Sequence, residues 1–323
     1  MRGLAGRSTV SDIALNMSDA FPEPDGPPVP APEPVIEPAA ETPAPDAVIT
    51  AEHAPTPPTE TFYRHTRVVR ITHWINVICI TLLLLSGLQI FNAHPMLYWG
   101  KYGADADTPF VSLGAIYGPG HVLQGVTKLG PLKLHTTGMF GVSGGEIRGY
   151  PKWLTLPASR DLADGRRWHF FMAWIFVING LVYLVSNAVN GHFKRDLAPT
   201  GAQLRPAAIW RDIVDHAMLK HPVGEEAKRY NVLQKLAYLG VILLLVLMVM
   251  TGLTMSPGFD AFAPGLLWLF GGRQSARTIH WICANLIVLF VLVHVIEVFI
   301  AGVFNEIGSM ITGRYTIKTG AGH

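Results

Sequence analysis

The chain has 323 residues, of which 50% are hydrophobic and only 15% are charged. A soluble domain normally carries about a quarter charged residues, so this composition is typical of a membrane protein and argues against a soluble one. The formal net charge of +2 is too small to indicate a polyanionic partner, and we expect no binding to nucleic acid.

Residues 1–60 differ in composition from the rest of the chain. They are rich in Pro, Ala and acidic residues and contain one aromatic side chain, Phe21. Such a segment buries too little apolar surface to offset its conformational entropy, so we predict a disordered tail ahead of a membrane domain at 61–318. The tail lacks the apolar core of a secretory signal peptide.

Four apolar windows follow the tail, at residues 71–91, 168–188, 236–255 and 279–301. Each is close to the ~20 residues that a helix needs to cross the hydrocarbon layer of a bilayer. Helices satisfy all their backbone hydrogen bonds within one segment, as lipid requires. The sequence therefore predicts an all-α integral membrane protein, a bundle of four transmembrane helices.

Two connecting segments are expected to have structure of their own. The long loop at 92–167 is rich in Gly and Pro and favours short strands and turns. A loop of this length is typical of a functional or docking segment. Residues 191–231 are strongly basic, and an amphipathic helix at 205–219 is expected to lie on the membrane surface.

The distribution of basic residues predicts the orientation. Basic residues precede the first apolar window, occur throughout 191–231 and follow the last window. The positive-inside rule therefore places both termini in the cytoplasm of a multi-pass protein of the bacterial plasma (inner) membrane. The loop at 92–167 would then be extracytoplasmic, facing the periplasm in a Gram-negative bacterium.

Four of the thirteen histidines lie within the apolar windows: His73, His169, His280 and His294. Ionisable residues are costly there and usually face a partner inside the bundle. His280 and His294 share one helix, ~21 Å apart along its axis and within ~40° of the same face. Because successive helices alternate in direction, His73 should lie level with His294, and His169 level with His280.

Two histidine pairs at two depths are what two bis-imidazole haems require. We therefore predict two haem b groups, with His73 and His294 binding the inner iron and His169 and His280 the outer iron. No CxxCH sequence is present, so attachment would be non-covalent. A lone membrane histidine is often only hydrogen-bonded between helices, but four at matching depths favour ligation.

Three of these histidines follow an arginine by three residues, in "RITH", "RRWH" and "RTIH". An arginine one turn from an axial ligand can pair with a haem propionate. We predict this role for Arg70 on the inner side and for Arg166, Arg167 and Arg277 on the outer side. The spacing alone is weak evidence, because arginines commonly flank membrane helices.

Two helix positions have open interpretations. Gly87 would let a macrocycle approach the backbone, although packing between helices explains it equally well. Glu297, one turn beyond His294, is suited either to carrying a proton near the inner haem or to a plain buried hydrogen bond.

The same residues carry a resemblance to a known family. The "THW" at His73, the "RRWH" of the second window and the His280–His294 spacing resemble the bacterial cytochrome b561 and Ni,Fe-hydrogenase cytochrome b family, over about 62–318. "RYNVLQKLAYL" and "GGRQSARTIHW" are similar to its thiosulfate reductase-type branch. The resemblance implies two b-type haems, a quinone site and a partner enzyme, in that branch a periplasmic molybdopterin oxidoreductase. The tail and the large first loop depart from the family pattern.

The expected function is that of a membrane-anchoring di-haem cytochrome b subunit. It would lie in the lipid bilayer and pass electrons between a periplasmic oxidoreductase and the quinone pool. Two alternatives are open: a stand-alone quinone-coupled oxidase of a small reductant such as superoxide, and a haem-free transporter or scaffold. Colourless purified protein would favour the last.

Overall fold

The computed structural model describes residue 26 and residues 59–104, 106–191, 197–218 and 231–318. The chain divides after Ala54, and the fold below is that of the second unit, Pro55–His323. The predicted tail at 1–60 lies almost wholly outside the described residues, as does much of the basic segment at 191–231.

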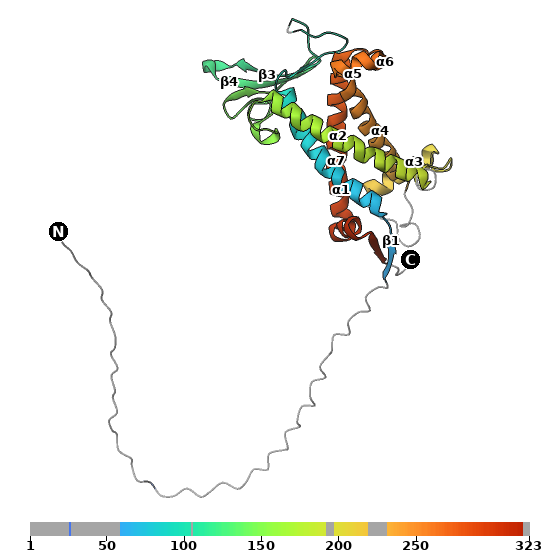
Figure 1. The fold of residues 1–323 in the computed structure, drawn as a ribbon. Coiled ribbons are helices and arrows are strands. Elements are labelled where there is room, and N and C mark those ends of the chain that lie inside the picture. Colours follow the sequence, from blue (N-terminus) through green and yellow to red (C-terminus); the bar gives the residue numbers. More distant parts are fainter. Residues whose placement is uncertain (1–25, 27–58, 105, 192–196, 219–230, 319–323) are drawn as a thin grey trace, which may run out of the picture. The chain divides into compact units, whose positions relative to one another are not determined.

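Four long helices are long and apolar enough to cross a membrane: α1 (Arg67–Phe91), α2 (Leu162–Val189), α4 (Val232–Thr254) and α7 (Arg273–Thr312) (Figure 1). They confirm the four predicted spans. Each begins four to six residues before its apolar window, and a side chain caps the first turn of α1, α2 and α4. Asp161, for example, accepts a hydrogen bond from the Asp164 amide at the start of α2.

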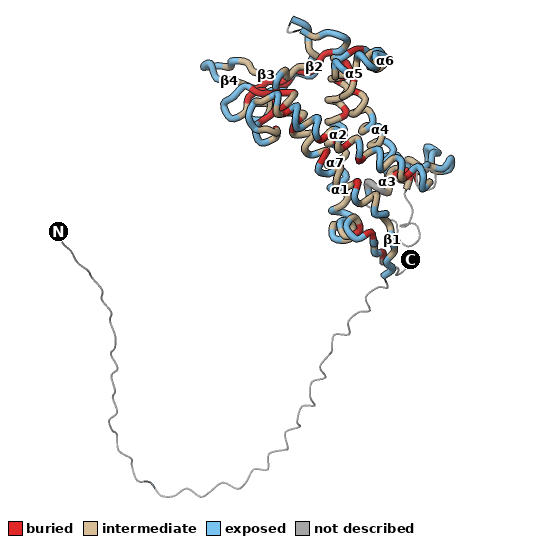
Figure 2. The backbone as a smooth tube through the Cα atoms, viewed as in Figure 1, coloured by how far each residue is buried: buried red, intermediate tan, exposed pale blue. Residues whose placement is uncertain are grey.

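The helices pack as α1 with α2 and α4 with α7, and α1 also contacts α7. Asn179 of α2 joins the first pair by donating to the Thr72 carbonyl at 2.9 Å and to the Asn76 side chain at 2.8 Å. Midway along the helices, Cys79, Met172 and Phe176 form a buried apolar cluster that α4 also covers. Many other apolar residues of the helices are exposed (Figure 2), as lipid-facing residues would be.

The first loop folds into short strands joined by turns, as the sequence predicts. Strands β2 (Met96–Leu97), β3 (Val111–Tyr117), β4 (Leu123–Leu129) and β5 (Leu132–His135) form an antiparallel sheet, and β6 (Gly141–Ser143) pairs with β7 (Glu146–Arg148). Short 3-10 turns lie at Pro119–His121 and Lys152–Leu154. Phe91 from α1 and Tyr150 from the loop share one buried core, against which Trp281 of α7 packs. This core attaches the sheet to one end of the helices (Figure 1).

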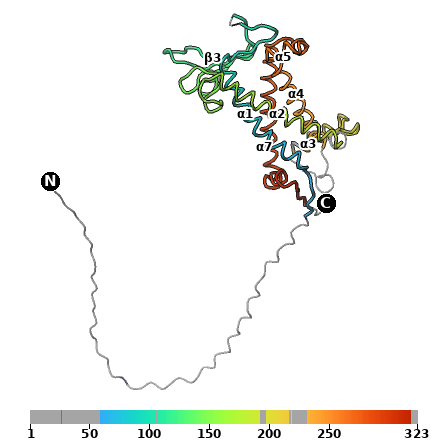
Figure 3. Tube along the Cα trace, in the orientation of Figure 1, coloured from blue at the N-terminus to red at the C-terminus, as the bar shows by residue number. Residues whose placement is uncertain are grey.

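The opposite end of the helices carries a strand pair that the sequence did not predict. Strand β1 (Thr59–Tyr63) precedes α1 and pairs antiparallel with β8 (Arg314–Lys318), which follows α7. Figure 3 shows these two segments, far apart in sequence, side by side near the C-terminal end. Helix α7 changes direction at Gly302, where φ is 109° and ψ is 87°. The apolar window at 279–301 thus ends where the helical backbone is interrupted.

Three shorter helices complete the described fold. Helix α3 (Pro206–Ala217) coincides with the amphipathic helix predicted at 205–219, and its Asp212 accepts a hydrogen bond from the Val232 amide at the start of α4. Helices α5 (Pro257–Phe262) and α6 (Pro264–Leu269) lie between α4 and α7 and begin at prolines, which suit the first turn of a helix.

Candidate functional site

The four membrane histidines form two facing pairs. His169 of α2 and His280 of α7 have ring centroids 6.3 Å apart, near the loop sheet, and are called here the loop-side pair. His73 of α1 and His294 of α7 have ring centroids 6.4 Å apart, toward β1 and β8, and are called the termini-side pair. The structure thus brings together the residues that the depth argument paired.

The separation of the rings is informative. An imidazole nitrogen binds a transition metal at about 2 Å and lies about 1 Å from its own ring centre, so two rings on opposite sides of one ion are roughly 6 Å apart. Both pairs match this spacing. A direct hydrogen bond between the two imidazoles would not explain why the ring separation is the same in both pairs. The spacing of each pair is therefore suited to two imidazoles that share one metal ion.

The loop-side rings are held by the helices opposite them. The Nδ1 of His169 lies 3.2 Å from Ser86 Oγ and 3.1 Å from the Leu83 carbonyl of α1. The Nδ1 of His280 lies 2.9 Å from Thr251 Oγ1 of α4. In both rings this leaves Nε2 as the nitrogen able to bind a metal. Sequence reasoning did not single out either hydroxyl.

One interpretation of Gly87 is that it lets a haem macrocycle approach the helix backbone. In the structure, the group that lies beside Gly87 is the imidazole of His169. A Cβ at position 87 would lie 3.3 Å from Cε1 of His169, so the missing side chain makes room for this imidazole. At Gly180 of α2, by contrast, a Cβ would meet nothing within 4 Å among the described residues.

The termini-side rings have mainly aromatic neighbours. His294 stacks on Phe290, one turn earlier in α7, with centroids 6.0 Å apart and ring planes 2° apart. His73 meets Trp74 edge-on at 5.5 Å. Trp74 donates its indole N–H to the Met310 carbonyl at 3.1 Å, beyond the interruption at Gly302. The two histidine pairs therefore have different surroundings.

Two of the predicted arginines, Arg70 of α1 and Arg277 of α7, contact backbone carbonyls. Arg70 donates to the Ile311 carbonyl, and its Nε has no hydrogen-bond partner among the described residues. Arg277 donates to the His94 carbonyl in the loop, and its guanidinium lies 5.6 Å from the Phe91 ring. Both guanidiniums lie about one turn from a paired histidine, and the propionate role stays a prediction.

The two arginines of "RRWH" are placed differently from each other. Arg166 lies 5.6 Å from the Phe170 ring of its own helix. Arg167 forms an exposed ion pair with Asp164 at 2.8 Å. Such an exposed pair contributes little stability and leaves the guanidinium accessible to another anion.

The loop is joined to α7 beside the loop-side pair. Trp281, the neighbour of His280, donates to Tyr150 Oη at 3.1 Å. Burial raises the pKa of Tyr150, so its hydroxyl stays protonated at neutral pH. Thr278 donates to the Tyr98 carbonyl at 2.6 Å, and Ser275 accepts from the Gly100 amide at 2.7 Å. These hydrogen bonds therefore connect the loop, and any protein that docks on it, to the helix that carries His280.

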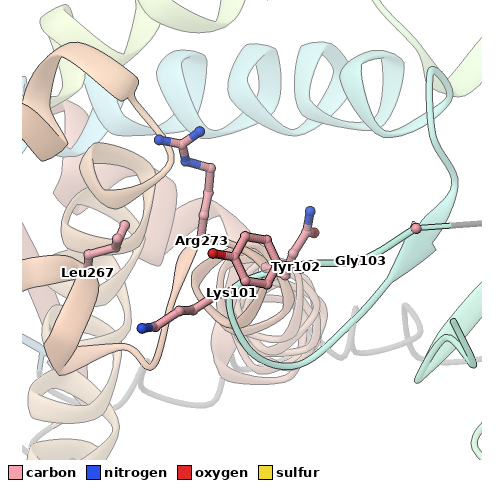
Figure 4. Close-up of a pocket in the computed structure, with 7 residues that line it drawn as sticks. Lys101, Tyr102, Gly103, Leu267 and Arg273 are labelled. Carbon is pink, nitrogen blue, oxygen red and sulfur yellow. The ribbon is translucent and has the colours of Figure 1, made fainter.

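A cavity of about 570 Å³ lies at this junction, away from the histidine rings (Figure 4). Lys101 and Tyr102 of the loop and Leu267 of α6 line it, together with Arg273 and Gln274 of α7. Arg273 is held by Asp260 at 2.6 Å. The cavity contains none of the predicted ligands.

Comparison with known proteins identifies the family to which the chain belongs. The family model for prokaryotic cytochrome b561 matches residues 64–313, which include both histidine pairs and the loop. The chain belongs to the prokaryotic cytochrome b561 family. It is therefore a membrane haem b electron-transfer subunit. The two histidine pairs fit a haem, because each offers two facing imidazoles at the spacing of axial ligands.

A curated relative extends the comparison. This cytochrome b561 is 27% identical over 243 residues to the putative protein-methionine-sulfoxide reductase subunit YedZ1 of Azospira oryzae. The match covers 73% of this chain and 90% of the relative. The relative is named as a subunit of a reductase, which agrees with a chain that works with a redox partner.

Proposed function

We propose that this cytochrome b561 binds two haem b groups, one between each histidine pair, and carries electrons between a periplasmic oxidoreductase and membrane quinone. The observation that carries the proposal is that two pairs of histidine rings lie 6.3 and 6.4 Å apart, at two levels of helix α7. His280 and His294 are ~21 Å apart along α7. Two groups at these levels would span most of the hydrocarbon layer.

Haem, when bound, supplies one-electron redox chemistry. The role of the chain is to hold and shield that chemistry. The two imidazoles of each pair would hold one haem iron between them and so leave no position open for oxygen or another small ligand. The apolar cluster of Cys79, Met172 and Phe176 lies on the helices between the two levels and excludes water from the route. Arg70, Arg166, Arg167 and Arg277 would bind the propionates at the two ends.

The partner would dock on the loop sheet, in the orientation that places the loop in the periplasm and both termini in the cytoplasm. The hydrogen bonds that Thr278 and Trp281 donate to the loop support this assignment, because they connect the docking surface to the helix that bears His280. The name of the relative suggests a methionine-sulfoxide reductase as partner. The family resemblance suggests a molybdopterin enzyme.

Quinone would bind near the termini-side pair, where Arg67 and Arg70 begin α1 and Glu297 lies one turn beyond His294. This placement gives the two ends of the route different functions. The loop-side end exchanges electrons with a protein, and the termini-side end with a lipid-soluble carrier.

The route can be tested by reducing haem with a quinol analogue in liposomes that contain the purified chain. In His294→Ala, which lacks the termini-side haem, we expect the quinol to fail to reduce the remaining haem, while dithionite still reduces it. In His169→Ala we expect quinol to reduce the remaining haem as in the wild type. Equal quinol reduction in the two variants would contradict the assigned route.

His135→Ala provides the matched control. His135 is exposed at the end of β5, outside both pairs, so its replacement should leave quinol reduction unchanged. A loss in this variant would show that the assay responds to general damage to the chain.

A further inference from the structure

The two loop-side histidines lie against the same short pattern on two different helices. Ser86 and Gly87 of α1 contact His169, and Thr251 and Gly252 of α4 contact His280. In each case a small hydroxyl residue is followed directly by glycine. The chain therefore presents one hydroxyl–glycine pair to each imidazole, from the helix that faces it.

The hydroxyl protons are already committed to the helix backbone. Ser86 Oγ donates to the Leu82 carbonyl at 2.6 Å, four residues earlier. Thr251 Oγ1 donates to the Leu247 carbonyl, also at 2.6 Å and four residues earlier. Each hydroxyl has one proton, so toward the histidine its oxygen acts as an acceptor.

It follows that each histidine carries its proton on Nδ1. A ring that donates from Nδ1 is neutral with a free lone pair on Nε2, the form required of a metal ligand. The His169 ring has a second acceptor, the Leu83 carbonyl, three residues before Ser86. The two hydroxyls thus select the tautomer that can bind iron.

The glycines set the position of the rings. A Cβ at position 87 would lie 3.3 Å from Cε1 of His169, and one at position 252 would lie 3.6 Å from Cε1 of His280. The first distance is tighter than ordinary van der Waals contact, and the second is within it. The absent side chain at position 87 lets the His169 ring approach the helix backbone closely enough for its hydrogen bond, and Gly252 leaves the corresponding space beside His280 open.

The termini-side pair differs. Among the residues that the structure describes, no hydroxyl lies at hydrogen-bonding distance from His73 or His294, whose recorded neighbours are aromatic. A hydrogen bond from the distal nitrogen of a ligating imidazole raises its basicity and so stabilises the oxidised metal. Only the loop-side level shows this device within the described chain.

We propose that Ser86–Gly87 and Thr251–Gly252 are positioning residues that fix the tautomer and orientation of His169 and His280, and so lower the midpoint potential of the loop-side haem. This inference rests on the ligand assignment made under the proposed function. It adds a level-specific control of potential by four residues that never touch the iron.

The test is a redox titration of detergent-purified protein, combined with electron paramagnetic resonance of the oxidised haems. In Ser86→Ala and Thr251→Val, we expect the loop-side midpoint potential to rise and its low-spin signal to shift, with the termini-side haem unchanged. Ser86→Thr and Thr251→Ser keep the hydroxyl and should restore both values. His169→Ala identifies which signal belongs to the loop side.

Matched controls come from the same helices. Thr81 donates to the Val77 carbonyl and Thr254 to the Met250 carbonyl, each at 2.8 Å, and neither contacts a paired histidine. Thr81→Val and Thr254→Val should leave both potentials unchanged. Should either control move the loop-side potential as far as its neighbouring test variant, the effect would belong to helix packing and the proposal would fail.

Other outcomes separate this inference from the proposed function. Full haem content with unchanged potential and signal in both Ser86→Ala and Thr251→Val would overturn the positioning role, while the ligand assignment would stand. Loss of the loop-side haem in Ser86→Ala with retention in Ser86→Thr would support it. Loss of the loop-side haem in both Ser86→Ala and Ser86→Thr would show that Ser86 serves helix packing, and would overturn the positioning role. Unchanged haem content in His169→Ala would instead refute the ligand assignment itself.

Discussion

The side chain of Arg148 is buried in the loop although it carries a charge. It donates to the Tyr150 carbonyl at 2.9 Å and to Thr155 Oγ1 at 3.2 Å, and it reaches Gln89 of α1 at 3.5 Å. A guanidinium is suited to this position because it offers five donors in a fixed plane. Arg148 therefore connects the end of α1 to the loop beneath the sheet.

Replacing Arg148 with Met should loosen the loop. The change leaves several buried acceptors unpaired, at about 1–3 kcal/mol each, and a total of about 3 kcal/mol would raise the open population roughly a hundredfold. Limited proteolysis of the loop in detergent should accelerate by about the same factor. Arg160→Met is the control, since Arg160 is exposed and makes one recorded hydrogen bond, to Ile147. Equal cleavage rates in the two variants would contradict the assigned role.

At the scale of the element, helix α7 carries both levels of the site. One face holds His280 and His294, while the first turn is attached to the loop and the last turns to α1. The direction changes at Gly302, whose φ of 109° lies in a region that favours glycine. Beyond it, the Met310 and Ile311 carbonyls accept from Trp74 and Arg70. The interruption thus brings the end of α7 back onto the start of α1.

Replacing Gly302 with Ala should weaken this attachment. A side chain at that backbone conformation costs about 1–3 kcal/mol, which a straightened helix would avoid by withdrawing the two carbonyls from α1. We expect the termini-side haem to be lost at a lower temperature, as followed by absorbance on heating. Gly308→Ala is the matched control, because it lies in the same helix with open space around it. It should be neutral or stabilising by about 0.5–1 kcal/mol. Equal loss temperatures in both variants would refute the role of Gly302.

At the scale of the whole molecule, the membrane unit has two different ends. The loop sheet and its core lie at one end, and the β1–β8 pair lies at the other (Figure 1). Each end is adjacent to one histidine pair. This division agrees with the proposed function, in which a protein partner and a quinone exchange electrons at opposite ends of one chain.

Much of this architecture could be predicted from the sequence, because length and periodicity determine it. The apolar windows predict the helices through the thickness of the bilayer, and the fixed rise of an α-helix places His280 and His294 at two levels. Alternating helix direction then pairs them with His169 and His73. The family model supports the resemblance that these residues carry.

Contacts between distant segments could not be predicted in the same way. The β1–β8 pair joins strands more than 250 residues apart (Thr61 and Thr316, |i−j| = 255), and the burial of Arg148 depends on how the loop packs on α1. Neither leaves a periodic signal. The hydroxyls beside His169 and His280 do leave a signal in the sequence: Ser86-Gly87-Leu88 and Thr251-Gly252-Leu253 are the same short pattern near the ends of two spans.

The central claim is that each histidine pair binds one haem. The most direct test is a reduced-minus-oxidised optical spectrum of the detergent-purified chain, with haem quantified per polypeptide, for the wild type, His169→Ala and His294→Ala. We predict two low-spin b-type haems in the wild type and the loss of a different one in each variant. A full haem content in either variant, or no haem in the wild type, would contradict the assignment.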